Sequence, residues 1–109
     1  MREAEEFRKH SEEALTHLYR ALVSASEDYE FEADYKAGSI TLELGKERTK
    51  VVVSPHAAAG QLWVSAHRKS YKLDWDVVQN TFVLGSTGQT LKELIEEAIS
   101  RQVGEDVTL

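Results

Sequence analysis

Apolar residues in the first quarter of the chain recur at steps of three and four, the period of one helix face. The stripe consists of Phe7, Ala14, Leu15, Leu18, Leu22 and Ala25. Neither glycine nor proline interrupts residues 2 to 37. The sequence therefore predicts an N-terminal helix that buries this stripe and ends near Ala25.

The hydrophobic pattern then changes to period two, which is typical of strands with one buried face. Turn residues divide the pattern into six predicted strands, at residues 29–35, 40–44, 49–53, 61–65, 71–75 and 81–84. We expect Pro55 to end the third strand and to open a loop that runs to Gly60. Short strands joined by tight turns predict antiparallel pairing.

A second helix is predicted after the last strand. Thr90 and Glu93 have the spacing of a capping box, and Gly104 is placed as the C-terminal stop. Two helices with one apolar stripe each can cover only one face of a sheet. We therefore expect one α+β domain over residues 1–109, a two-layer sandwich. In it the N- and C-terminal helices lie roughly parallel on one face of an antiparallel sheet of about six strands.

The strand from Gln61 to Ser65 alternates polar and apolar residues without a break. If Leu62 points into the core, Gln61, Trp63 and Ser65 point away from it. Tryptophan is enriched where proteins contact each other. The alternative is a second layer that makes Trp63 part of the core. Because two helices cover one face, we expect Trp63 to be substantially exposed and Trp75 to lie on the inner face.

Charge and composition exclude several classes of function. The 109 residues carry a net charge of -6 and include no cysteine. Nucleic-acid affinity comes largely from Lys and Arg, so we expect no nucleic-acid partner and favour metal cations or basic protein surfaces. The chain cannot hold an iron–sulfur cluster through its own sulfurs. Without an apolar run of about 20 residues or a recognisable leader, a cytoplasmic protein without membrane contact is expected.

Carboxylates gather in and just before the first predicted strand. They are Glu27, Asp28, Glu30, Glu32 and Asp34. Alternate strand residues lie about 7 Å apart on one face, too far for one ion to bind three of them directly. Carboxylate oxygens suit hard cations such as Mg²⁺, Mn²⁺ and oxidised iron, so we expect weak, partly water-mediated binding. The alternative is a solvated face whose charge prevents edge-to-edge aggregation.

The first helix offers a second candidate metal site. Glu6, His10, Glu13 and His17 follow steps of four, three and four, which places them in one stripe beside the apolar face. Imidazoles and carboxylates suit Zn²⁺, Fe²⁺ or Co²⁺. The alternative is an ordinary polar flank. If the stripe does bind a cation, a cation-dependent hydrolase is a further hypothesis. No Ser–His–acid triad can be argued from the sequence and it contains no glycine-rich phosphate loop, so we assign no catalytic residue.

Several short motifs occur in the order and spacing of a known family. They are Gln61-Leu62-Trp63-Val64, the segment from Tyr71 to Trp75, Phe82 with Gly88, and Leu91-x-x-Leu94. On these motifs the chain resembles the frataxin family, the iron-binding proteins of iron–sulfur cluster assembly. The resemblance covers about residues 5 to 104.

This resemblance implies an iron chaperone that binds Fe²⁺ or Fe³⁺ weakly. It implies an iron donor to, or regulator of, the cysteine desulfurase and the scaffold protein. The resemblance also allows a ferroxidase-type activity. It does not imply that the chain is a self-sufficient enzyme. Ser54 and His56 take the places of the family's Asn near the end of the third strand and of a Gln two residues later. The implied partner surface is Gln61, Trp63, Ser65, Ser54 and His56. We expect a monomer, or an oligomer that forms with iron.

The acidic ridge of the family also covers the last turns of the first helix. Here those positions hold Tyr19, Arg20, Val23 and Ser24, so only the strand half of the ridge remains. This departure motivates the alternative of a protein-interaction module of the same fold with no physiological metal role.

Overall fold

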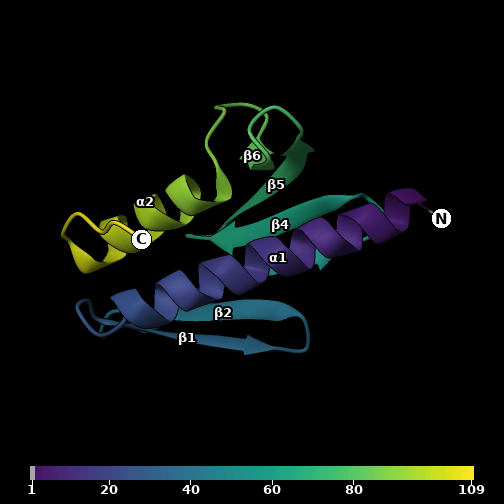
Figure 1. Ribbon diagram of the computed structural model, residues 1–109. Coiled ribbons are helices and arrows are strands. Elements are labelled where there is room, and N and C mark those ends of the chain that lie inside the picture. Colours follow the sequence, from purple (N-terminus) through teal and green to yellow (C-terminus); the bar gives the residue numbers. More distant parts are fainter. Residues whose placement is uncertain (1) are drawn as a thin grey trace.

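The computed structural model describes residues 2–109, and side chains from Ala4 onward. Along the chain, one helix precedes six strands and a second helix follows them, as Figure 1 shows. The elements are α1 (Arg2–Ala25), β1 (Phe31–Lys36), β2 (Ser39–Leu44), β3 (Thr49–His56), β4 (Gln61–Ala66), β5 (Lys69–Asp76), β6 (Thr81–Leu84) and α2 (Leu91–Val103).

The strands form one antiparallel sheet in which each strand pairs with its neighbours in the chain, from β1 to β6. Two-residue turns join β1 to β2 and β4 to β5. Their central residues all have positive φ, as the twist of a tight hairpin requires. Ala37 and Gly38 form the first turn, whereas His67 and Arg68 form the second without glycine. His67 Nε2 lies 3.2 Å from the Ala98 carbonyl oxygen, which ties the second turn to α2.

The core lies between one face of the sheet and both helices. The alternate strand residues that face the helices are buried, among them Ile40, Leu42, Leu44, Val51, Val53, Leu62, Val64 and Leu73. The stripes of α1 and α2 supply the other half, with Leu15, Leu22, Ile95 and Ile99 fully buried. In Figure 1, α1 lies across the strands and α2 runs in the same direction beside it. The predicted two-layer α+β sandwich is confirmed.

The caps of α2 also match the prediction. The backbone N–H of Glu93 donates to Thr90 Oγ1 at 3.2 Å, and the Thr90 N–H donates to Glu93 Oε1 at 3.0 Å. Gly104 ends the helix with φ 78, a conformation that glycine adopts without strain. Among residues 2–109, no helix combines the length and apolarity needed to cross a membrane.

The predicted end of the third strand is wrong. β3 continues through Pro55, which pairs with Leu62 of β4. Because β2 pairs with β3 only as far as Val53, the end of β3 has a neighbour on one side only. A proline lacks the N–H that a second neighbour would need, so it is tolerated there. This extension places Ser54 and His56 in the sheet rather than in a loop.

The predicted start of the first strand also shifts. The Tyr29 N–H still bonds to the Ala25 carbonyl at the end of α1, so β1 begins only at Phe31. Glu30 lies just before the strand, where its carbonyl accepts a hydrogen bond from the Gly45 N–H. The helix end therefore takes the residues that alternation alone assigns to the strand.

Candidate functional site

The face of the sheet opposite the helices carries a compact group of polar and aromatic side chains. Two cross-strand rows from β3, β4 and β5 form it. Ser54, Trp63 and Lys72 are paired in one row, and His56, Gln61 and Asp74 in the next. We call these six residues the tryptophan patch.

Trp63 is held in place from several sides. Its ring stacks on the His56 imidazole, with the ring centroids 3.5 Å apart and the planes 16° from parallel. Lys72 Nζ lies 4.8 Å from the ring centroid, within the range of a cation–π contact. The indole Nε1–H donates to Gln61 Oε1 at 3.1 Å. These contacts fix the orientation of Trp63 before any partner arrives, which lowers the entropy lost on binding.

Hydrogen bonds extend this arrangement to both ends of the patch. Gln61 Nε2 donates to Asp74 Oδ1 at 3.1 Å, so one amide connects the indole to a carboxylate. At the other end, Ser54 Oγ lies 3.5 Å from His56 Nε2. Ser65 lies further along β4, exposed on the same face. All five side chains of the predicted partner surface thus share one face of the sheet.

The prediction that Trp63 is substantially exposed is wrong in degree. The indole points away from the core, as the alternation of β4 indicates, but it is only half-buried rather than open. The reason is His56, whose ring covers it once β3 extends past Pro55. Sequence reasoning also missed Lys72 and Asp74, although the alternation of their strand could have placed both outward.

The predicted acidic residues are spread over a turn and a strand. Glu27 and Asp28 lie in the turn after α1, and Glu30 precedes β1. Glu32 and Asp34 are exposed on β1 and alternate with the inward-facing residues of that strand. The predicted row of Glu30, Glu32 and Asp34 on one strand face is therefore wrong for Glu30, because β1 begins only at Phe31.

A sixth carboxylate joins the group from the neighbouring strand. Glu32 is paired directly with Glu43 of β2, and Arg48 Nη1 lies 3.8 Å from Glu43 Oε2. Like charges directly opposite each other in a sheet repel. Within the described part of the chain, no group of three or more His, Cys, Asp or Glu side chains is arranged to hold a metal ion. A cation on this surface would therefore be bound openly, with few protein ligands.

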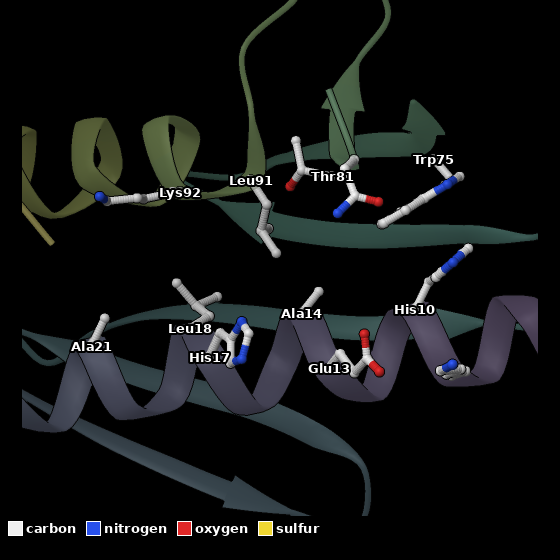
Figure 2. A pocket seen from close by; sticks show the side chains of 12 residues that line it. His10, Glu13, Ala14, His17, Leu18, Ala21, Trp75, Thr81, Leu91 and Lys92 are labelled. Carbon is white, nitrogen blue, oxygen red and sulfur yellow. The ribbon is translucent and has the colours of Figure 1, made fainter. Parts of the chain in front are cut away.

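The second predicted metal site lies on the other side of the molecule. His10 stacks on Trp75, with ring centroids 3.7 Å apart and planes 10° from parallel. Glu13 and His17 follow on the same side of α1, and all three line a cavity beside α2, as Figure 2 shows. In the described residues these three side chains do not converge as a metal triad.

Among the described side chains, two carboxyl groups have a clearly shifted pKa, and both have structural roles. Hydrogen bonds from the Gln79 side chain and from the backbone N–H groups of Gln79 and Val78 lower the pKa of Asp76. Hydrogen bonds with the Thr90 backbone and side chain lower the pKa of Glu93 in the capping box. These hydrogen bonds stabilise a turn and a helix start, and the shifts that they cause do not mark a catalytic centre.

Comparison with known proteins finds a matching family model and several named relatives. The family model of the frataxin-like domain matches residues 1–105. The iron-sulfur cluster assembly protein CyaY of Dechloromonas aromatica is 28% identical over 104 residues, which is 95% of each chain. CyaY of Tolumonas auensis is 28% identical over 82 residues, 75% of this chain and 76% of that one. Mitochondrial frataxin of Arabidopsis thaliana is 28% identical over 109 residues, 96% of this chain and 58% of that one.

A solved structure shares the whole architecture. The frataxin from Psychromonas ingrahamii superimposes with a TM-score of 0.76 at 18% identity, covering 96% of this chain and 95% of that one. At that identity the likeness concerns the fold. The match of the family model over nearly the full length is the stronger finding, and it shows that the chain belongs to the frataxin family.

Proposed function

We propose that this chain is an accessory protein of iron–sulfur cluster assembly, acting as an iron donor to, or regulator of, that machinery. It docks on the cysteine desulfurase and scaffold protein through the tryptophan patch, and it carries weakly bound iron on its carboxylates. Two relatives are named iron-sulfur cluster assembly proteins, and these names support a role of this chain in the same process. The observation that carries the proposal is the preorganised Trp63 ring on the face that neither helix covers.

The patch has the chemistry of a protein-binding surface. Tryptophan is enriched among the residues that contribute most to the binding energy of protein interfaces. Such residues contribute most when neighbouring contacts exclude water. His56 and Lys72 already shield part of the Trp63 ring. The net charge of -6 favours partners with basic surfaces and speeds their encounter.

Iron binding rests on a different set of side chains. Glu32 and Asp34 are exposed on β1, and Glu43 faces Glu32 across the strand pair. Mutual repulsion among these carboxylates is relieved by a cation, and open oxygen sites bind weakly. Such a site would release iron readily, as a donor must.

The docking proposal is tested by measuring affinity for a purified desulfurase–scaffold complex. Trp63→Ala is expected to weaken binding by more than about 1 kcal/mol, roughly fivefold, because a central aromatic anchor is lost. Thr41→Ala is the matched control, since Thr41 lies on the same face of the sheet but outside the patch. Equal affinity of folded Trp63→Ala and wild type would refute the docking surface.

A second candidate function is a protein-interaction module with no metal role. It is favoured by the missing acids at Tyr19, Arg20, Val23 and Ser24 and by the lack of a convergent metal group among the described residues. An NMR titration with Fe²⁺, or with Co²⁺ as a redox-inert substitute, separates the two. Shifts confined to residues 28–34 support the iron role, whereas shifts at residues 10–17 identify the helix as the cation site. A titration without saturable shifts supports the interaction module.

A further inference from the structure

A cavity of about 460 Å³ lies between α1, the β5–β6 hairpin and the start of α2 (Figure 2). We call it the α1–α2 cavity. Its volume lies within the range of small-molecule sites, about 300–1,000 Å³. The tryptophan patch lies on the other face of the sheet, so the proposed docking function makes no use of this cavity.

The walls of the α1–α2 cavity differ in chemistry. The apolar part consists of Ala14, Leu18, Ala21 and Leu91. His10 and Trp75, stacked on each other, form an aromatic wall at one end. In Figure 2 this stack lies at the right, while Leu91 reaches from α2 toward α1. An apolar floor beside a flat aromatic wall suits a planar ring, because aromatic faces and edges pack in defined geometries.

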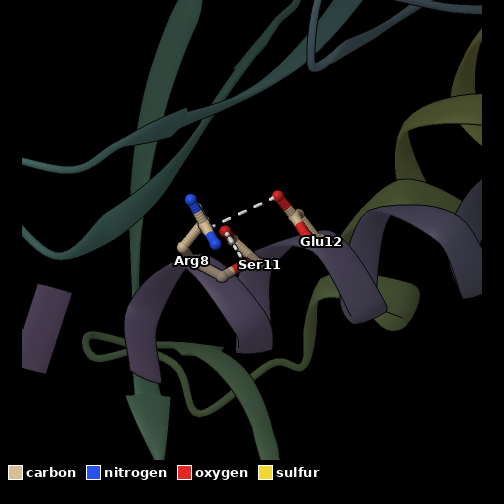
Figure 3. Close-up of polar contacts among 3 residues, drawn as sticks. All are labelled: Arg8, Ser11 and Glu12. Carbon is tan, nitrogen blue, oxygen red and sulfur yellow. Dashed lines mark hydrogen bonds and ion pairs between the residues drawn. The ribbon is translucent and has the colours of Figure 1, made fainter. Parts of the chain in front are cut away.

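The rim of the cavity is positive in an otherwise acidic protein. Lys9 from α1 and Lys92 from α2 contribute two ammonium groups, against the single carboxylate of Glu13. Within the described side chains, the ion pairs join Arg8 to Glu12 (Figure 3) and Arg48 to Glu43, so neither of them involves a cavity lysine. Asn80, Thr81 and His17 add hydrogen-bonding groups to the same rim. The rim therefore complements a negative group.

We infer that the α1–α2 cavity binds a small planar anion, an aromatic or heteroaromatic ring that carries a carboxylate or a phosphate. The ring lies on the apolar floor beside the His10–Trp75 stack, and the negative group meets Lys9 and Lys92. A divalent cation fits less well. The two lysines repel it, and the described residues form no convergent metal group.

Titrations followed by two-dimensional NMR of the whole chain test this inference. The probes are 2-naphthoate, 2-naphthyl phosphate and, as a neutral compound with the same ring and the same point of attachment, 2-naphthamide. Both anions should give saturable shifts around His10, Trp75 and Leu91, with an affinity at least about fivefold above that of the amide. The better of the two anions identifies the preferred acid group. Shifts located elsewhere, or equal affinity for the amide, would overturn the inference.

Charge reversal at the rim gives the second readout. Lys92→Glu should weaken 2-naphthoate binding at least about fivefold, because it removes one attraction and adds one repulsion. Lys69→Glu is the matched control, since it makes the same charge change at an exposed site outside the cavity. Equal losses in both variants would mean general charge attraction rather than a site. Binding of Zn²⁺ at His10 and His17 without any response to the anions would make the cavity a cation site.

Discussion

Trp63 and Trp75 both stack on a histidine, but they do so on opposite faces of the sheet. Trp63 meets His56, with ring centroids 3.5 Å apart, and both residues belong to neighbouring strands. Trp75 meets His10 at 3.7 Å, and this histidine belongs to a helix in the other layer. The two local contacts are nearly the same, whereas the elements that they connect differ.

The difference lies in what each contact adds to the fold. Trp75 packs edge-on against Phe82 at 5.2 Å, and Phe82 meets Phe7 of α1 at 6.0 Å. This aromatic chain joins the helix layer to the sheet, so it forms only when the two layers pack. Trp63 contacts residues of the neighbouring strands β3 and β5, so its contacts stay within the sheet layer. One stacked pair therefore supports the core, and the other shapes a surface.

The largest effect is expected for Trp75→Ala, which should lower the free energy of unfolding by about 3 kcal/mol, as losses of packed aromatics do. The variant removes the contacts with both His10 and Phe82. Urea unfolding followed by circular dichroism measures the change. Trp75→Phe is the control and should lose clearly less, because it keeps an aromatic ring against Phe82. A loss below about 1 kcal/mol would mean that the chain of rings does not support the core.

A smaller loss, about 1–2 kcal/mol, is expected for Trp63→Ala in the same experiment. The indole is half-buried and gives up its stacking on His56 and its hydrogen bond to Gln61, but the core stays intact. His56→Ala should lose less still and increase the exposure of Trp63, which fluorescence quenching in a Trp75→Phe background can report. If Trp63→Ala were more destabilising than Trp75→Ala, the roles of the two faces would be reversed.

A substitution among the carboxylates of β1 and β2 should increase the stability of the fold instead of lowering it. Glu32→Lys is expected to raise the free energy of unfolding by roughly 0.5 kcal/mol, because it turns the pair with Glu43 from repulsive to attractive. Asp34→Lys is the matched control, since Asp34 is paired with Thr41 and gains no such partner. Thermal unfolding at low salt measures both variants. Equal gains would show that net charge, and not the Glu32–Glu43 pair, sets the effect.

The smallest effect concerns acid stability, and it bears on the hairpin next to Trp75. Hydrogen bonds lower the pKa of Asp76 and of Glu93 in the folded state. A group with a lowered folded-state pKa stabilises the fold above its unfolded pKa, and this stability is lost as the pH falls through the folded value. The double variant Asp76→Asn and Glu93→Gln should therefore show a flatter loss of stability below about pH 4 than wild type. Urea midpoints measured across that range provide the test, and parallel curves for both proteins would contradict it.

Much of the fold could be predicted because its signals are local. The period of the α1 stripe, the capping box of Thr90 and Glu93, and the stop at Gly104 each depend on residues within a few positions. A boundary was predicted wrongly where strand pairing overrode a local signal. At Pro55 the residue type predicted a loop, but the end of β3 lacks a neighbour on one side and accommodates it.

The candidate site was predicted in part. Alternation placed Gln61, Trp63 and Ser65 outward, which is a property of the strand itself. It could not give the degree of exposure, because that depends on His56 from another strand. Glu32 and Asp34 were correctly assigned to the first strand, but Glu30 lies before it, and the facing carboxylate of Glu43 follows from the strand register.

The sequence by itself determined which elements form, where α1 ends, where α2 begins and ends, and which side chains of each strand point the same way. These properties arise from backbone geometry and short-range hydrogen bonds. Only the tertiary structure decided that His10 stacks on Trp75 and that Lys9 and Lys92 face one cavity. Such contacts join residues far apart in the chain. They depend on how α1 and α2 are positioned on the sheet, which the packing of the whole core sets and no local pattern encodes.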